Sequence, residues 1–187
     1  FAMIDNRIKL TADVFQKTTS DLINTIQFPD GGAAYTYNAG EMQNRGIELS
    51  LNTINFDGDF KWTTNFNITF YENEITEMGY NPVEYAGYQN VNRIEKGQPL
   101  GNFYGYVVSQ VNPANGVLEY KDINGDGFIT PQDRTIIGNA MPSSFFGFTN
   151  NFSYKGLFLD VLFTGVEGND IFNASRIDLE GMLNSKN

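Results

Sequence analysis

The sequence predicts an all-β fold, and three observations support this. Apolar and polar residues alternate with a period of two over long stretches, which is the pattern of strands with two different faces. Aromatic residues make up 14% of the 187 residues and favour strands. Disordered chains are poor in aromatics, and helical bundles need Ala, Glu, Lys and Leu in bulk, so the composition excludes both classes.

The first strand and the first hairpin are predicted from alternation in the N-terminal third. Residues 8–14 alternate apolar and polar, and so do residues 47–51 and 60–70. Asp57-Gly58 lies between the last two runs and is a strong signal for a two-residue hairpin turn. Such a turn would pair Leu51 with Thr64 and Leu49 with Phe66, which keeps the apolar side chains on one face.

A second hairpin is predicted near the C-terminus. Lys155-Gly156 separates two alternating arms, and a two-residue turn there pairs Phe152 with Leu159 and Phe148 with Phe163. In this register Asn150 is the one polar residue on the apolar face of its strand.

The length of these strands favours a transmembrane barrel over a soluble sandwich. Each arm supports roughly ten alternating residues, close to the about 9–11 of a tilted membrane-spanning strand, whereas soluble strands average about five or six. One face is rich in Phe with Tyr or Trp near its ends, and the other carries Asn, Thr and Ser. A core face and a lipid face look alike in sequence, so a soluble β-sandwich stays open on pattern alone.

Residues 72–143 are predicted to be a loop-rich region, because Gly and Pro interrupt the alternation there. Strand-like pieces remain at residues 103–108 and 117–121. Tight turns on one side and long loops on the other are typical of outer-membrane barrels. An even number of spanning strands must lie between the two hairpins, and zero and two both fit.

A calcium-type loop is predicted at residues 122–133. The stretch matches the EF-hand loop, with Gly127 at the position of the sharp turn. The expected oxygen ligands at positions 1, 3, 5, 7, 9 and 12 are Asp122, Asn124, Asp126, the Phe128 carbonyl, Thr130 and Asp133. Position 12 is Asp rather than Glu, and no helix-forming run flanks the loop. The alternative is an Asx-rich turn whose carboxylates are merely solvated.

Charge and missing residue types exclude several functions. The net charge of −10 argues against binding nucleic acid or anionic lipid surfaces. The chain has no Cys and no His, which removes thiol chemistry, a Ser–His–Asp triad and the commonest zinc ligand. No run of 18 apolar residues forms a membrane helix. We therefore expect no enzyme activity.

Three segments resemble one family. They are KDINGDGFITPQDRTIIGNAMPSSFFGFTNNFSYKGLFLDVLFTGVEGNDIFN at residues 121–173, KGQPLGNFYGY at residues 96–106 and NRGIELSL at residues 44–51. Together, in this order, they resemble the SusC/RagA family of TonB-linked outer-membrane proteins of Bacteroides-type bacteria (Bacteroidota).

The resemblance implies a fold and a setting. Members of the SusC/RagA family form a 22-stranded antiparallel barrel in the outer membrane, and the TonB complex pulls an N-terminal plug inside that barrel. A SusD-like surface lipoprotein covers the barrel as a lid and captures glycans or peptides. Residues 1–187 would then be one segment of the second half of the barrel, of six to eight strands with long extracellular loops. The plug, the TonB box and a signal peptide would lie outside it.

Three functions follow as hypotheses. The first is a TonB-dependent importer of oligosaccharides or peptides, with the loop region 72–143 as the surface for the lid. The second is a scaffold barrel in a larger outer-membrane complex. The third is a soluble, calcium-stabilised β-sandwich that acts as an adhesin or glycan-binding module. The polar face of Asn, Thr, Ser and Glu suits sugars and peptides equally.

Overall fold

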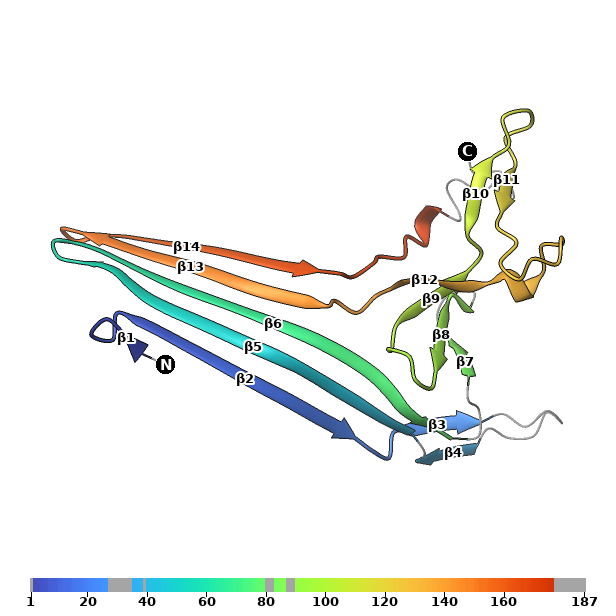
Figure 1. Cartoon of the computed structure of the whole chain (residues 1–187), viewed down its shortest axis with the longest axis horizontal. Helices are drawn as coiled ribbons and strands as arrows, with labels where there is room; N and C mark the ends of the chain where they lie inside the picture. The colour runs from blue at the N-terminus through green and yellow to red at the C-terminus, as the bar shows by residue number, and fades with distance from the viewer. Residues whose placement is uncertain (1, 27–34, 39, 80–82, 87–89, 177–187) are drawn as a thin grey trace.

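The computed structural model describes residues 2–26, 35–38, 40–79, 83–86 and 90–176 (Figure 1). Its body is one antiparallel sheet with the strand order β1-β2-β5-β6-β13-β14. These strands are β1 (Ala2–Met3), β2 (Ile8–Thr19), β5 (Gly40–Asp57), β6 (Phe60–Met78), β13 (Ser144–Tyr154) and β14 (Leu157–Glu167). Among the described residues, no helix is long and apolar enough to cross a membrane.

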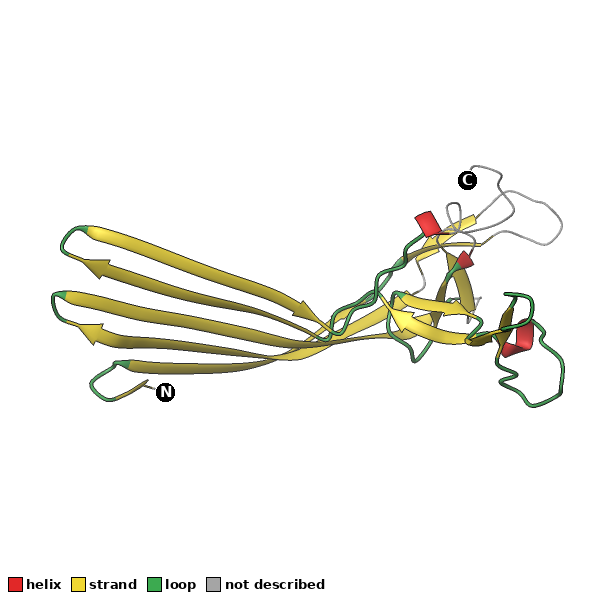
Figure 2. Ribbon diagram, turned by 90° about the horizontal axis from the view of Figure 1, so that it is seen from above, coloured by secondary structure: helices red, strands yellow, loops and turns green. Residues whose placement is uncertain are grey.

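The sheet forms a single layer and does not close on itself (Figures 1 and 2). Within the described residues no second sheet covers its apolar face, on which Val14 and Phe163 are 82% and 57% exposed. A β-sandwich would bury this face against a second sheet. The sandwich hypothesis is therefore wrong, and the all-β antiparallel prediction of an open barrel segment is confirmed.

The tight turns and the long loops lie at opposite ends of the sheet. The β5–β6 and β13–β14 turns lie side by side at one end in both views (Figures 1 and 2). The shorter strands other than β1 gather at the other end. This is the asymmetry that the sequence predicts for an outer-membrane barrel, with the turns periplasmic and the loops extracellular.

The β13–β14 hairpin has the predicted register. Tyr154 pairs with Leu157, Phe152 with Leu159 and Phe148 with Phe163. Lys155 and Gly156 have φ of 46° and 85°, so both turn residues are left-handed. This combination is that of a type I′ turn, whose twist matches the twist of the strands that it joins.

The predicted register of the β5–β6 hairpin is wrong by two residues. Leu51 pairs with Phe66 rather than Thr64, because the pairing shifts between Ile54 and Phe56 and resumes with Asp57 opposite Lys61. The turn is therefore longer than two residues, and Asn55 is the extra residue of a bulge. A shift of two leaves every side chain on its predicted face, since the side-chain period of a strand is two.

The strands β6 and β13 pair directly over their whole membrane length, from Phe70 opposite Ser144 to Phe60 opposite Tyr154. Among the described residues no spanning strand therefore lies between them, which favours zero over two of the alternatives that the sequence leaves open. β6 also continues to Met78, so the break in regular structure begins after the expected residue 72.

The connections at the loop end are themselves folded. The predicted piece at residues 103–108 is interrupted, because β9 ends at Gly105 and β10 begins at Val108, and the piece at residues 117–121 contains the strand β11 at Leu118–Tyr120. One sheet has the order β12-β9-β8-β7, and two hairpins are β10–β11 and β3–β4. Their bounds are β3 (Ile23–Ile26), β4 (Tyr35–Asn38), β7 (Val83–Ala86), β8 (Asn92–Glu95), β9 (Asn102–Gly105), β10 (Val108–Val111), β11 (Leu118–Tyr120) and β12 (Thr135–Asn139).

This loop structure is fastened to the top of the barrel wall. The Ile75 amide donates to the Gln98 carbonyl at 3.0 Å, and the Gly97 amide donates back to the Ile75 carbonyl at 2.8 Å. The side chain of Asn73, which is 4% exposed, accepts from the Leu100 amide at 2.8 Å. At the other attachment, Asp170 accepts from the Asn139 amide at 2.9 Å. The loop sheet is thus held by hydrogen bonds to β6 and to the segment after β14.

A glycine permits close packing inside the sheet at Gly46. The Phe15 ring lies over this residue from the neighbouring strand, and a Cβ built on Gly46 would lie 2.6 Å from Phe15 Cζ and against the Phe70 carbonyl oxygen. An aromatic ring that covers a glycine on the neighbouring strand helps to fix the register in which the two strands pair.

We predict that Gly46→Ala lowers the stability of the full-length receptor by about 1–3 kcal/mol, the usual cost of overpacking. Gly58→Ala is the matched control, because a Cβ there meets nothing within 4 Å, and we expect its effect to stay within about 0.5 kcal/mol. The measurement is the unfolding temperature of each purified receptor in detergent. Equal unfolding temperatures for the two variants would contradict the packing argument.

Candidate functional site: membrane face and calcium-type loop

The apolar face of the sheet has the height of a membrane. From Phe60 to Phe70 the strand advances about 33 Å at about 3.3 Å per residue. A tilt of about 40° reduces this to a height of about 25 Å, which is that of the apolar band of outer-membrane barrels. Across this band Phe66, Phe148 and Phe163 form a row, with both ring pairs at 6.3 Å between centroids. This face is the lipid face of the barrel segment.

An aromatic cluster marks the turn end of the lipid face. Trp62 stacks on Phe56 at 5.9 Å and on Phe152 at 5.7 Å, and Phe60 stacks on Phe152 at 6.3 Å. Amphipathic aromatic rings are enriched where a barrel leaves the hydrocarbon. The cluster therefore marks a membrane interface at the level of the tight turns, which is the side that the sequence predicts to be periplasmic.

Asn150, the predicted exception on the lipid face, has hydrogen-bond partners there. Its Oδ1 accepts from Trp62 Nε1 at 2.9 Å and from Thr64 Oγ1 at 2.8 Å. Thr64 in turn accepts from Asn55 Nδ2 at 2.8 Å. Only an unsatisfied polar group is costly in an apolar environment, so this connected group is tolerated there.

The opposite face carries polar ladders that run between strands. The Asn65 amide group donates to Asn52 at 2.5 Å, and Asn151 donates to Asp160 at 2.7 Å. This is the polar lumen face that the alternation predicts. Strand β14 is an exception to this polar character, because the apolar residues Phe158 and Leu162 lie on the lumen face together with Asp160.

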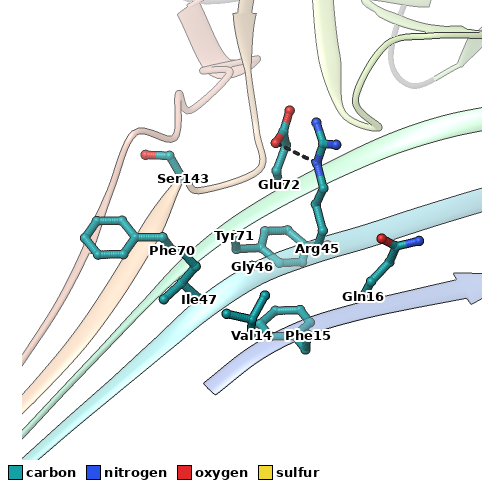
Figure 3. Close-up of a pocket in the computed structure, with 10 residues that line it drawn as sticks. All are labelled: Val14, Phe15, Gln16, Arg45, Gly46, Ile47, Phe70, Tyr71, Glu72 and Ser143. Atoms are coloured by element: carbon teal, nitrogen blue, oxygen red, sulfur yellow. Dashed lines mark hydrogen bonds and ion pairs between the residues drawn. The ribbon is translucent and has the colours of Figure 1, made fainter. Parts of the chain in front are cut away.

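A trough crosses the lipid face at its extracellular edge (Figure 3). Its volume is about 700 Å³. Its lining residues are Val14, Phe15, Gln16, Arg45, Gly46, Ile47, Phe70, Tyr71, Glu72 and Ser143. Arg45 Nε and Glu72 Oε2 lie 3.0 Å apart and form the first charged pair beyond the apolar band. Sequence reasoning missed this trough, although the appearance of Arg45 and Glu72 in alternating positions signals where the apolar face ends.

The predicted calcium-type loop lies at the extracellular end, between β11 and β12. Three of its predicted ligand side chains fold back onto the loop. Asp122 accepts from the Gly125 and Gly127 amides at 2.6 and 2.7 Å. Asn124 accepts from the Asp126 amide at 3.0 Å, and Asp126 accepts from the Phe128 amide at 2.9 Å. The structure therefore brings Asp122, Asn124 and Asp126 together in consecutive Asx turns.

Asp133 closes the loop by joining its two ends. The carboxylate is fully buried and accepts from the Thr130 amide at 2.7 Å and the Ile123 amide at 2.8 Å. Thr130 caps the short 3₁₀ helix η2 (Pro131–Asp133) in a capping box. The Thr130 amide lowers the pKa of Asp133, and the Ile123 and Asn124 amides lower it further, although burial opposes them.

The donor set fits a hard cation in part. Carboxylate, amide and carbonyl oxygens are the ligands that Ca²⁺ takes, and Asp122, Asn124, Asp126 and the Phe128 carbonyl supply them from one tight turn. Asp133 is committed to backbone amides, and Thr130 to the capping box. In the described part of the chain, no three acidic, His or Cys side chains converge on a common point.

We predict that Asp133→Asn opens the loop, because an amide presents one acceptor oxygen where the carboxylate presents two. A carboxylate whose pKa is lowered by folding stabilises the folded state fully at pH values above its ordinary pKa of about 3.9. This stabilisation is lost as the pH falls from that value through the lowered pKa of the folded state, because the carboxylate becomes protonated. Proteolysis of the loop in the full-length receptor, in EDTA, should therefore rise below about pH 4 in the wild type and be high at every pH in the variant. Similar cleavage of both at pH 7 would refute the role of Asp133.

The chain is similar in sequence to known TonB-dependent receptors. The chain is 29% identical to TonB-dependent receptor P3 of Formosa agariphila over 98% of its length, and 31% identical to TonB-dependent receptor SusC of Bacteroides thetaiotaomicron over 83%. It covers 21% and 17% of these two proteins, so it spans about one fifth of the length of the relatives it matches. Both relatives are named as TonB-dependent receptors.

The fold is similar to that of solved structures. The structure described as the RagAB peptide transporter superposes with a TM-score of 0.77 at 23% identity, over 90% of this chain and 20% of that one. The RagAB peptide importer in its 'closed-closed' state gives a TM-score of 0.74 over 95% of this chain.

The family profile described as "TonB dependent receptor-like, beta-barrel" matches residues 3–173. This range includes the lipid face, the calcium-type loop and all three segments that resemble SusC/RagA sequences. The chain belongs to the TonB-dependent receptor β-barrel family, and its predicted SusC/RagA resemblance is confirmed.

Proposed function

We propose that this chain forms part of the wall and the extracellular surface of a TonB-dependent importer in the outer membrane. The direct pairing of β6 with β13 supports this most strongly. It makes one continuous sheet of five long strands with a lipid face of about 25 Å, and it puts the described residues of the segment 79–143 at the extracellular end. A binding surface carried on a rigid barrel is the arrangement that capture and import require.

The proposal includes the partners that the sequence predicts. A SusD-like lipoprotein would contact the folded loops above the lumen, and a TonB complex would act through a plug outside this chain. Outer-membrane lipid would surround the apolar face. The folded and fastened loop sheet supports a docking role, since a rigid surface loses little entropy on binding.

The proposed substrates are oligosaccharides or peptides. The lumen face offers amide and carboxylate groups such as Asn52, Asn65 and Asp160. These groups hydrogen-bond hydroxyls and peptide groups equally well. The similarity to the RagAB peptide transporter is at 23% identity, so it supports the fold and does not distinguish peptides from oligosaccharides. Both substrate classes therefore stay in the proposal.

The proposed role of the loop 122–133 is to bind a structural Ca²⁺ that stiffens the extracellular surface. Asp122, Asn124, Asp126 and the Phe128 carbonyl are its proposed core ligands. Thr130 and Asp133 complete the EF-hand spacing, and Asp133 would have to share its oxygens with the amides that it now binds.

The import proposal is tested in the parent organism. Deleting the receptor gene, or inactivating TonB, should abolish growth on the same oligosaccharide or peptide from a panel, because uptake needs both. A tagged receptor should also retain its lid lipoprotein during purification. Growth that depends on the receptor but not on TonB would contradict import and favour the scaffold alternative.

The calcium proposal is tested by calorimetric titration of the purified full-length receptor. We expect one site in residues 122–133 that Asp122→Ala weakens by at least about tenfold, because it removes the position 1 ligand. Asp59→Ala, at the periplasmic turn, is the control and should bind calcium like the wild type. Unchanged affinity in Asp122→Ala would refute this site.

A further inference from the structure

Two Asn-Gly pairs lie in the loops at the extracellular end of the molecule. Asn115-Gly116 lies in the turn between β10 and β11, and Asn124-Gly125 lies within the calcium-type loop (Figure 1). All four residues are exposed. Asn is a thermolabile residue, and a following Gly makes it more so, because no side chain shields the glycine nitrogen. Judged by these two residues alone, the two pairs are equally reactive.

Loss of the side-chain amide from an Asn-Gly pair requires two events. The glycine nitrogen gives up its proton and attacks Asn Cγ, where a C–N bond forms while the side-chain nitrogen leaves as ammonia. Water then opens the five-membered succinimide at either carbonyl, which gives Asp or isoaspartate. A pair is therefore protected where the glycine proton is held, or where the Asn side chain cannot turn toward the glycine nitrogen.

The fold protects Asn124 in both ways. The Gly125 amide donates to the Asp122 carboxylate at 2.6 Å, and loss of that proton would place a second negative charge beside the carboxylate. The Asn124 side chain accepts from the Asp126 amide at 3.0 Å, and it donates to the Asp126 carboxylate at 3.0 Å and to Gln132 at 3.3 Å. Hydrogen bonds to a charged group are the strong ones, so the loop must open before Asn124 reacts.

Asn115 is held by neutral groups. The Gly116 amide donates to the Asn112 carbonyl at 2.8 Å, and Asn115 Oδ1 accepts from the Val117 amide at 3.0 Å. Both bonds lie within one exposed turn that joins two short strands. Loop tips of this kind open locally at little cost in free energy. The protection found at Asn124 is therefore weaker at Asn115.

We propose that Asn115 is a site of spontaneous deamidation and that Asp122 protects Asn124 from the same reaction. Deamidation puts a new carboxylate on the exposed β10–β11 turn, and the isoaspartate product also lengthens the backbone by one methylene. The extracellular surface of the receptor thus changes with the age of the protein. This inference rests on local hydrogen bonds and depends neither on import nor on calcium.

The test is incubation of the purified full-length receptor at mildly alkaline pH in EDTA, followed by trypsin digestion and mass spectrometry. Cleavage after Lys96, Lys121 and Arg134 gives a separate peptide for each Asn-Gly pair. We expect the mass increase from amide to acid to accumulate at least about tenfold faster at Asn115 than at Asn124, since only Asn124 must break charge-assisted hydrogen bonds. A sample digested without incubation corrects for amide lost during digestion.

An Asp122→Ala variant and the unfolded receptor separate the effect of the fold from that of the sequence. In Asp122→Ala we expect Asn124 to lose its amide about as fast as Asn115, while Asn115 keeps its wild-type rate. Asp59→Ala, which removes a carboxylate at the opposite end of the sheet, is the matched control and should leave both rates unchanged. Receptor unfolded in urea should lose both amides at similar rates.

Three results would overturn the proposal. Equal rates at the two pairs in the folded wild type would show that the fold does not protect Asn124. Continued protection of Asn124 in Asp122→Ala would remove the role of that carboxylate. An intact Asn115 in the folded receptor, at a time when the unfolded receptor has lost this amide, would show that the β10–β11 turn is protected as well.

Discussion

The pairing of β6 with β13 is the constraint on which the rest of the structure depends. In hydrocarbon every backbone amide and carbonyl needs a partner within the protein, so a strand cannot leave the sheet until it has crossed the membrane. β6 ends at Met78 and β13 begins at Ser144, and the two strands pair over the whole apolar band. The described residues between the two strands therefore fold outside the bilayer, and the binding surface can vary without disturbing the wall.

Rigidity of that surface comes from buried polar groups. Asn73 and Asp133 are 4% and 0% exposed, and each accepts hydrogen bonds from the loop backbone. Loop amides that found no partner would cost free energy if buried, so such side chains decide the loop conformation. A calcium ion at residues 122–133 would add to an order that the carboxylate of Asp133 already provides.

The two hairpins show where sequence reasoning succeeds and where it stops. At Lys155-Gly156 the turn alone decides the register, because left-handed φ values at both residues select one turn type. At Asp57-Gly58 the bulge at Asn55 adds a residue, and Arg7, which directly precedes the neighbouring strand β2, donates to the Ile54 and Asn55 carbonyls. A register shift of two residues leaves every apolar side chain on the same face, so the alternating pattern of the sequence cannot reveal the shift.

The sequence by itself determined the strand class, the two faces, the side on which the tight turns lie and the calcium-type spacing, because these follow from local periodicity and turn chemistry. The tertiary structure alone decided that no strand spans the membrane between β6 and β13, that Asp133 binds amides, and that Arg45 and Glu72 border a trough. The first and third of these features depend on contacts between residues that are far apart along the chain, and the second depends on hydrogen bonds within a folded loop. An alternating pattern of apolar and polar residues carries no information on which partner a strand or a carboxylate takes.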